Sequence, residues 1–240
     1  MIDLHIDGAV ARLTLNRPEV RNALAVRHWH ALADILPQIT ASGAQVLLLS
    51  GAGGAFSAGA DLSEFETFVD EPAARPEFRL AMRTAMDGLA ALPLPAIAWI
   101  DGPCFGAGVA LAMACDIRIA SPAARFAITP AKMGIGYPQE DVARLVGLVG
   151  PGWASRLLFT GAAIDAATAE RIGLVESIAD TPDALIGELA AADSGSISML
   201  KRGIDLAKSG FASDSAQDAR FDDLLGGEVL RDRLSRRRAT

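Results

Sequence analysis

The chain has 240 residues, of which 51% are hydrophobic and 21% charged, which suffices for one large folded domain and argues against a disordered chain. Its formal net charge is −7, from 22 basic and 29 acidic residues, so no nucleic-acid partner is expected. The one basic cluster lies at the C-terminal end, at Arg231, Arg233 and 236–238, and is interpreted as a solvated helix end.

The first 180 residues alternate predicted strands with predicted helices. Residues 9–15 alternate small or apolar residues with polar ones, as a half-buried strand does, and a helix with one apolar face follows and ends at Pro37. Short apolar runs at 46–50 and 96–100 are typical of strands covered on both faces, and an amphipathic helix lies between them. With further strand candidates at 117–120 and 174–178, the pattern predicts an α/β fold.

After about residue 181 the strand signals disappear. Three segments are predicted to be helices broken by Gly and Ser: 183–192, 197–208 and 216–238. We therefore predict an α/β core over residues 1–180 and a helical C-terminal appendage over residues 181–240.

The cysteines and the termini bear on the cellular compartment. Cys104 and Cys115 lie in an apolar stretch without the spacing of a metal or redox pair, and are expected to be buried free thiols. The N-terminus has acidic residues where a signal peptide has basic ones, and the apolar stretch 103–115 is too short to cross a bilayer. The sequence predicts a soluble, cytoplasmic protein with no membrane partner and no metal site.

Two glycine-rich turns, 51–62 and 101–108, each follow a buried strand and precede a helical stretch. Such turns leave the first backbone N–H groups of a helix without partners, so they can bind an oxyanion or a phosphate, although a plain tight turn is an equally good interpretation. Neither turn has the Gly-Lys-Ser/Thr ending of a P-loop. The second lacks the third glycine of the dinucleotide fingerprint.

Serine hydrolase chemistry is excluded by the order of residues. The segment 55–59 is close to a nucleophile elbow around Ser57, but no histidine follows His30, and that fold needs one after the serine. His28 and His30 are two apart on a predicted helix, and we interpret them as part of a solvated face.

Several segments together resemble the crotonase (enoyl-CoA hydratase/isomerase) superfamily. Residues 16–24 are similar to its CoA-contacting turn, 56–62 to its first oxyanion-hole loop, and 101–120 to its second loop with the following helix and strand. The resemblance covers about residues 8–210. It implies a ββα-spiral core, with the C-terminal appendage forming a homotrimer that often pairs as a dimer of trimers.

The resemblance also implies the substrate class and the groups that bind it. The substrate is expected to be an acyl-CoA thioester, with coenzyme A as part of the substrate and no separate cofactor. The backbone amides of Ala60 and Ala107 would stabilise the thioester enolate, and one such donor is worth about 3–4 kcal/mol in other oxyanion holes. The positions that match the family's CoA contacts are Arg21, Ala23, Leu24, Ala58, Ala60, Asp61 and Leu62.

The sequence departs from the hydratases of that family at both of their catalytic glutamates, whose positions hold Ala110 and Pro130. The groups that remain nearby are Tyr137, Glu140 and Asp141. For these, structural roles stay open: a packed aromatic ring, and acids that favour a helix N-terminus.

Three functions are therefore predicted as alternatives. The first is an enzyme of the hydratase/isomerase class in which Glu140 or Asp141 moves a proton. The second is a decarboxylase similar to methylmalonyl-CoA decarboxylase, in which Tyr137 orients the departing carboxylate. The third is an acyl-CoA-binding protein that has lost the chemistry.

Overall fold

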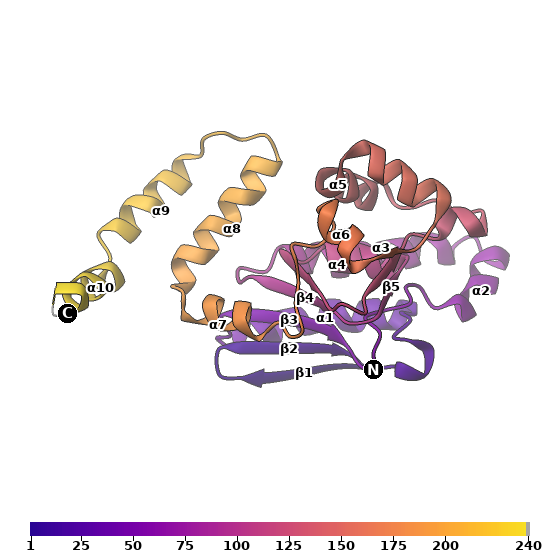
Figure 1. Ribbon diagram of the computed structural model, residues 1–240, viewed down its shortest axis with the longest axis horizontal. Coiled ribbons are helices and arrows are strands. Elements are labelled where there is room, and N and C mark those ends of the chain that lie inside the picture. Colours follow the sequence, from indigo (N-terminus) through magenta and orange to yellow (C-terminus); the bar gives the residue numbers. More distant parts are fainter. Residues whose placement is uncertain (239–240) are drawn as a thin grey trace.

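The computed structural model describes residues 1–238 and is built around a six-stranded sheet (Figure 1). The strand order is β1–β2–β3–β4–β6–β9, with β1 antiparallel to β2 and the other neighbours parallel. The strands are β1 (Ile2–Asp7), β2 (Val10–Leu15), β3 (Val46–Gly51), β4 (Ala96–Ile100), β6 (Ile117–Ala120) and β9 (Ser177–Ile178). The predicted strands are confirmed, although the last is only two residues long, and β1 was not predicted.

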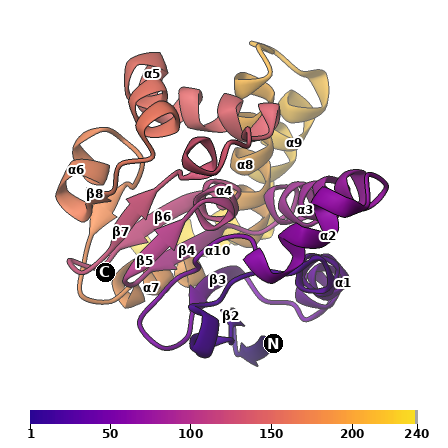
Figure 2. The same cartoon turned by 90° about the vertical axis from the view of Figure 1, so that its right-hand side faces the viewer.

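A smaller sheet gives the core its repeating unit. It consists of β5 (Pro103–Phe105), β7 (Arg125–Ala127) and β8 (Ile164–Asp165), in the order β5–β7–β8. Strands β4 and β5 are followed by helix α4 (Ala107–Met113), and β6 and β7 by α5 (Gln139–Thr160). Each of these ββα units therefore contributes one strand to the large sheet, one strand to the small sheet and one helix that packs outside the strands (Figure 2). The predicted α/β spiral is present.

The main core lies between the large sheet and three helices, α1 (Val26–Ala41), α3 (Ala74–Ala90) and α4. Helix α1 does not end at Pro37, as predicted, but continues for another turn. Pro37 lies on the exposed side of the helix, where water can reach the carbonyl that loses its partner, while Leu36 and Ile39 remain buried. Burial on the core side thus outweighs the proline.

Short helices complete the core. Helix α2 (Phe65–Asp70) precedes α3, and α6 (Ala166–Arg171) follows β8. Helix α7 (Asp183–Ala191) lies just beyond the predicted core boundary at residue 180, yet its Ile186 is buried in a second apolar cluster with Val46, Leu48, Ile97 and Ile119 of the large sheet. The division at residue 180 stays a prediction.

The last three helices form an arm that extends from the core (Figure 1): α8 (Ser194–Lys208), α9 (Ser215–Leu225) and α10 (Glu228–Arg238). The single helix predicted over 216–238 is divided at Gly226 and Gly227. Residues 239–240 of the predicted appendage lie outside the described residues. Lys201 joins α8 to the core, since its buried ammonium group donates to the Leu94 carbonyl at 3.0 Å and contacts Asp116 at 2.8 Å.

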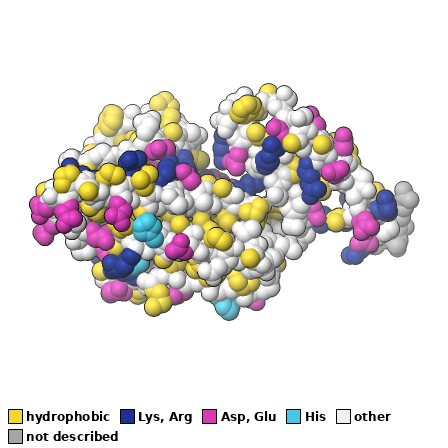
Figure 3. Space-filling view, turned by 180° about the vertical axis from the view of Figure 1, so that it is seen from behind, with side chains coloured by type: hydrophobic (Ala, Val, Ile, Leu, Met, Phe, Trp, Pro, Cys, Tyr) yellow, Lys and Arg dark blue, Asp and Glu magenta, His cyan; other side chains and the backbone are white. Residues whose placement is uncertain are grey.

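The arm exposes many large apolar side chains, which alternate with charged ones (Figure 3). They include Leu200, Ile204, Phe211, Phe221, Leu225, Val229 and Leu234. The predicted trimer stays a prediction.

Both cysteines are free and buried, as predicted, and burial raises the pKa of each thiol, to about 12 for Cys115. Within residues 1–238, no helix is long and apolar enough to span a membrane.

Candidate active site

The two glycine-rich turns, distant in sequence, lie side by side in the structure. The Ser57 amide donates to the Pro103 carbonyl at 3.1 Å, and the Phe105 amide donates to the Ser57 carbonyl at 2.8 Å. Gly59, with φ +95°, lies at one of these close approaches, because a Cβ there would lie 2.6 Å from the Phe105 carbonyl oxygen and 3.0 Å from the Ala107 nitrogen. Glycine at 59 is thus required for the two turns to meet.

Two backbone N–H groups at this junction have no acceptor. The Leu24 amide donates to the Gly59 carbonyl, and the Leu24 carbonyl accepts from the Asp61 amide. The amide of Ala60, which lies between these two residues, takes no part in this pairing. Ala107 is the first residue of α4, where an amide has no partner inside the helix. Within residues 1–238, neither amide donates to a protein acceptor. Unpaired backbone N–H groups are the donors that an oxyanion hole uses, and the role of these two as such a hole stays a prediction.

Both amides border a mainly apolar cavity of about 340 Å³. The first turn supplies Ala58, Ala60 and Leu62, the second turn and α4 supply 106–107 and Ala110, and α3 supplies 78–79 and 82. The fourth wall is the segment 129–138, apart from the two residues 131–132 and Gly134. Stacked rings of Phe68 and Phe78, with centroids 4.8 Å apart, brace the side formed by α2 and α3. A cavity of this kind suits an apolar acyl group.

The positions of both absent glutamates face this cavity. Ala110 and Pro130 belong to its lining, so neither supplies a carboxylate there. Tyr137 also lines it, and its hydroxyl donates to the Gly106 carbonyl at 3.0 Å, directly before the Ala107 amide. Burial raises the pKa of the Tyr137 phenol well above its ordinary value, and the charge of Asp141 raises it further. The phenol is therefore neutral at physiological pH.

Asp141 and Glu140 have different surroundings despite being neighbours in sequence. Asp141 is 1% exposed and lines the cavity, whereas Glu140 is 55% exposed and does not belong to the cavity lining. The Oδ1 atom of Asp141 contacts Arg83 at 3.4 Å and Arg144 at 3.3 Å. Its Oδ2 atom accepts no hydrogen bond from residues 1–238. One oxygen is fixed and the other is available to a ligand.

Burial and the two arginines act on Asp141 in opposite directions. Loss of solvent raises the pKa of its carboxyl, and the charges of Arg83 and Arg144 lower it by less, so the pKa lies above the ordinary value. Such a carboxyl exchanges a proton more readily near neutral pH than an exposed aspartate does.

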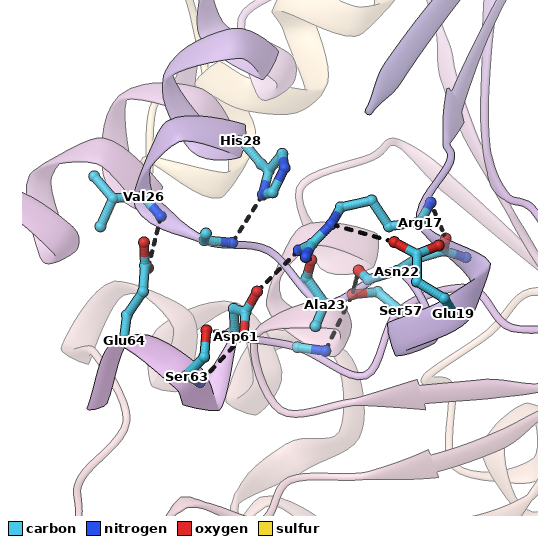
Figure 4. Close-up of polar contacts among 12 residues, drawn as sticks. Arg17, Glu19, Asn22, Ala23, Val26, His28, Ser57, Asp61, Ser63 and Glu64 are labelled. Carbon is cyan, nitrogen blue, oxygen red and sulfur yellow. Dashed lines mark hydrogen bonds and ion pairs between the residues drawn. The ribbon is translucent and has the colours of Figure 1, made fainter. Parts of the chain in front are cut away.

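The N-terminal turn 16–24 is fixed to the first glycine-rich turn by polar contacts (Figure 4). The Asn22 amide group donates to the Ala52 and Ala55 carbonyls at 2.9 and 2.8 Å, and the Ser57 hydroxyl donates to the Asn22 carbonyl at 2.8 Å. Arg17 contacts Asp61 at 2.9 Å. These contacts hold the two segments in register.

The surroundings of Asp61 show what its carboxylate does. Hydrogen bonds from Ser63 and the nearby Arg17 lower the pKa of Asp61 to about 2, and both of its oxygens have protein partners. The carboxylate therefore stabilises the turn, and contact of this residue with CoA stays a prediction.

Three of the seven predicted CoA-contacting residues border the cavity. Ala58, Ala60 and Leu62 line it, while Ala23 and Leu24 are buried just behind the first turn. Arg21 is exposed, with φ +51°, and its carbonyl accepts from the Ala58 amide at 2.8 Å. Within residues 1–238 its guanidinium group has no hydrogen-bond or ion-pair partner, and its contact with a CoA phosphate stays a prediction.

The interpretation of His28 as part of a solvated face was wrong. His28 is 8% exposed, and its Nδ1 atom accepts from the Ala25 amide at 3.0 Å at the start of α1 (Figure 4). Burial, with the charges of nearby arginines, lowers the pKa of His28 to about 4. His28 is a neutral helix cap, whereas His30 is exposed as predicted.

Comparisons with known proteins agree with this geometry. The family model described as enoyl-CoA hydratase/isomerase matches residues 5–197. The chain belongs to the enoyl-CoA hydratase/isomerase family. The crotonase-like fold is thereby confirmed.

Individual members of the family are similar over most of the chain. The probable enoyl-CoA hydratase EchA6 of Mycobacterium bovis is 35% identical over 77% of this chain and 73% of its own. An enoyl-CoA hydratase/carnitine racemase structure from Magnetospirillum magneticum superposes with a TM-score of 0.93 at 31% identity, covering 99% of this chain and 92% of the other. A Thermobifida fusca protein solved in complex with acetoacetyl-CoA gives 0.82 at 31% identity, covering 92% and 91%.

Sequence reasoning missed the arginines around the cavity. Arg83 and Arg144 hold the Asp141 carboxylate, and Arg79 lines the cavity itself. The signal was present, because Arg75, Arg79 and Arg83 recur at the four-residue spacing that places side chains on one face of a helix.

Proposed function

We propose that the protein is an acyl-CoA isomerase that shifts a carbon–carbon double bond through a thioester enolate. The observation that carries this proposal is that two amides without acceptors and one buried carboxylate, Asp141, border the same apolar cavity. Family membership supports the substrate class, and a related structure contains acetoacetyl-CoA.

The number of carboxylates favours isomerisation over hydration. Asp141 is the only carboxylate among the described residues that line the cavity. Hydration by the usual route needs one group to activate water and another to deliver a proton, whereas a double-bond shift needs a single group that removes a proton and returns it.

The proposed reaction assigns each step to a group of this chain. The thioester oxygen of a 3-enoyl-CoA accepts hydrogen bonds from the Ala60 and Ala107 amides. The Asp141 carboxylate takes a proton from C2, the C–H electron pair forms a C1–C2 double bond, and the carbonyl π pair moves onto that oxygen, where the two amides stabilise it. The protonated Asp141 then returns the proton to C4 as the C2–C3 double bond forms. Atoms and charge balance without a further reactant.

Decarboxylation with Tyr137 is the second candidate, because the phenol lies in the cavity beside the Ala107 amide. The hydroxyl has a single hydrogen, which it donates to the Gly106 carbonyl. It has none left for the carboxylate of a substrate. This makes decarboxylation the less favoured alternative.

A substrate screen with paired variants tests the proposal. A 3-enoyl-CoA, crotonyl-CoA and methylmalonyl-CoA are offered to the wild type, to Asp141→Asn and to the adjacent control Glu140→Gln. We expect turnover of the 3-enoyl-CoA, a loss of about 10²–10⁴-fold in Asp141→Asn, and a change below about threefold in Glu140→Gln. Urea denaturation of both variants separates lost chemistry from lost folding.

The screen also has outcomes that refute the proposal. Crotonyl-CoA hydration that survives Tyr137→Phe, Glu140→Gln and Asp141→Asn would remove every proton-transfer group considered. Turnover of methylmalonyl-CoA alone would establish the decarboxylase. Tight binding of CoA esters without turnover of any of them would identify a non-catalytic acyl-CoA-binding protein.

We also propose that the arm forms a homotrimer or a dimer of trimers. The exposed apolar side chains of α8, α9 and α10 support this, because a monomeric protein rarely exposes so many in one region.

A further inference from the structure

Three arginines form a row along one face of α3, four residues apart. At one end, Arg75 donates to the Phe68 and Val69 carbonyls at 2.6 and 2.9 Å and so fixes the end of α2. At the other end, Arg83 contacts Asp141 at 3.4 Å. The side chains of Arg75 and Arg83 are therefore both held by contacts within the fold.

The middle arginine, Arg79, has no such partner. Its side chain makes no hydrogen bond or ion pair with any other residue in the range 1–238, although it borders the cavity between Phe78 and Met82. The two acidic residues that border the same recess as Arg79 form their ion pairs with other arginines: Asp141 with Arg83 and Arg144, and Glu140 with Arg83 at 3.6 Å. The Arg79 guanidinium group at the border of this mainly apolar cavity is therefore left to interact with a ligand.

The position of Arg79 indicates which part of a ligand it would meet. A narrow recess continues from the cavity and is lined by Arg79, Met82, Arg83, Met86, Pro138, Glu140 and Asp141. No residue of either glycine-rich turn borders this recess, so it lies away from the Ala60 and Ala107 amides. An acyl group with its thioester at those amides would direct its far end toward Arg79.

We infer that Arg79 selects acyl-CoA thioesters whose acyl chain ends in a carboxylate. The apolar lining accommodates the methylene groups, and the guanidinium group pairs with the terminal carboxylate, a geometry for which arginine is well suited. The inference rests on the proposed function for the placement of the thioester, and it adds the class of acyl group.

Calorimetric titration of the full chain with three probes tests this inference. Glutaryl-CoA carries the terminal carboxylate, pentanoyl-CoA has the same chain length without it, and free CoA reports on the phosphates alone. The variants are Arg79→Met, Arg79→Lys, and Arg27→Met as a control at an exposed arginine outside the cavity lining.

We expect the wild type to bind glutaryl-CoA about tenfold more tightly than pentanoyl-CoA, since a charge-assisted pair at an accessible site contributes about that factor. Arg79→Met should abolish the preference for glutaryl-CoA and change the affinities for pentanoyl-CoA and free CoA by less than about twofold. Arg79→Lys should keep part of the preference, and Arg27→Met should keep all of it.

Three results would overturn the inference. Equal affinity of the wild type for both esters would show that the cavity does not select a carboxylate, while pentanoyl-CoA binding would leave the proposed function standing. Equal weakening of both esters and free CoA by Arg79→Met would assign this arginine to a CoA phosphate. Failure of every CoA ester to bind would refute the proposed function itself, and the inference with it.

Discussion

The contact between the two glycine-rich turns depends on Gly59, so a substitution there tests how the Ala60 and Ala107 amides are positioned. Replacing it with alanine adds a Cβ 2.6 Å from the Phe105 carbonyl oxygen and 3.0 Å from the Ala107 nitrogen, at a φ of +95°. The two turns must then separate, which moves the Ala60 and Ala107 amides apart and should destroy the proposed oxyanion hole.

Backbone strain and a steric clash together determine how far Gly59→Ala should lower the free energy of unfolding. The positive φ costs an alanine about 1–2 kcal/mol, and forcing a methyl group into a closed contact adds about 1–3 kcal/mol, so the free energy of unfolding should fall by about 2–5 kcal/mol. Misplacing one amide should lower turnover by about 10²–10³-fold, the loss measured when other oxyanion holes lose one donor.

The control for this substitution lies in the same turn. Gly54 has φ +72°, but a Cβ there would meet nothing within 4 Å. Gly54→Ala should therefore cost only the backbone strain, about 1–2 kcal/mol, and leave turnover unchanged. Urea denaturation gives the stability of both variants, and turnover of the substrate found in the screen gives their activity. Equal activity of Gly59→Ala and Gly54→Ala would refute the claim that contact between the turns positions the amides.

Three further predictions concern the groups around the site and the arm. Arg144→Gln removes one of the charges that lower the pKa of Asp141, so the acidic limb of the kcat/KM profile should move to higher pH; an unchanged limb would show that Asp141 is not the base. Asp61→Asn should lower the free energy of unfolding by about 2 kcal/mol at pH 7, because the pKa of Asp61 is depressed from 3.8 to about 2 in the folded protein. A depressed pKa stabilises the fold above the unfolded value and loses that effect as pH falls, so the difference between variant and wild type should vanish between about pH 4 and 2 in acid denaturation. Truncation after residue 192, which keeps α7 on the core and removes the arm, should give monomers where the full chain gives trimers by light scattering, whereas a persistent trimer would exclude the arm as the assembly element.

The large sheet and the helices on its main face were predictable because their periodicity is strong. Buried parallel strands such as β3 and β4 appear as short apolar runs, and α3 has a clear apolar face. The three-residue strands β5 and β7 were not predicted, since a strand that short has no measurable alternation. The end of α1 was misplaced because the burial of Ile39 beyond Pro37 depends on tertiary packing.

The site was predictable only in part, for a similar reason. The glycine-rich turns and the loss of both glutamates were apparent from the sequence, because they depend on residue type at a known spacing. The difference between Glu140 and Asp141 depends on which of two adjacent side chains faces inward. Arg144 lies one turn further along the same helix as Asp141, whereas Arg83 reaches it from α3, 58 residues away in sequence. A pair that distant leaves no local pattern in a single sequence.

The most direct test of the central claim is a crystal structure of the protein with acetoacetyl-CoA. The account predicts that the thioester oxygen lies about 2.7–3.1 Å from both the Ala60 and the Ala107 nitrogen, with the acyl group in the cavity beside Asp141. A thioester oxygen that meets neither amide, or an acyl group bound outside the cavity, would contradict it.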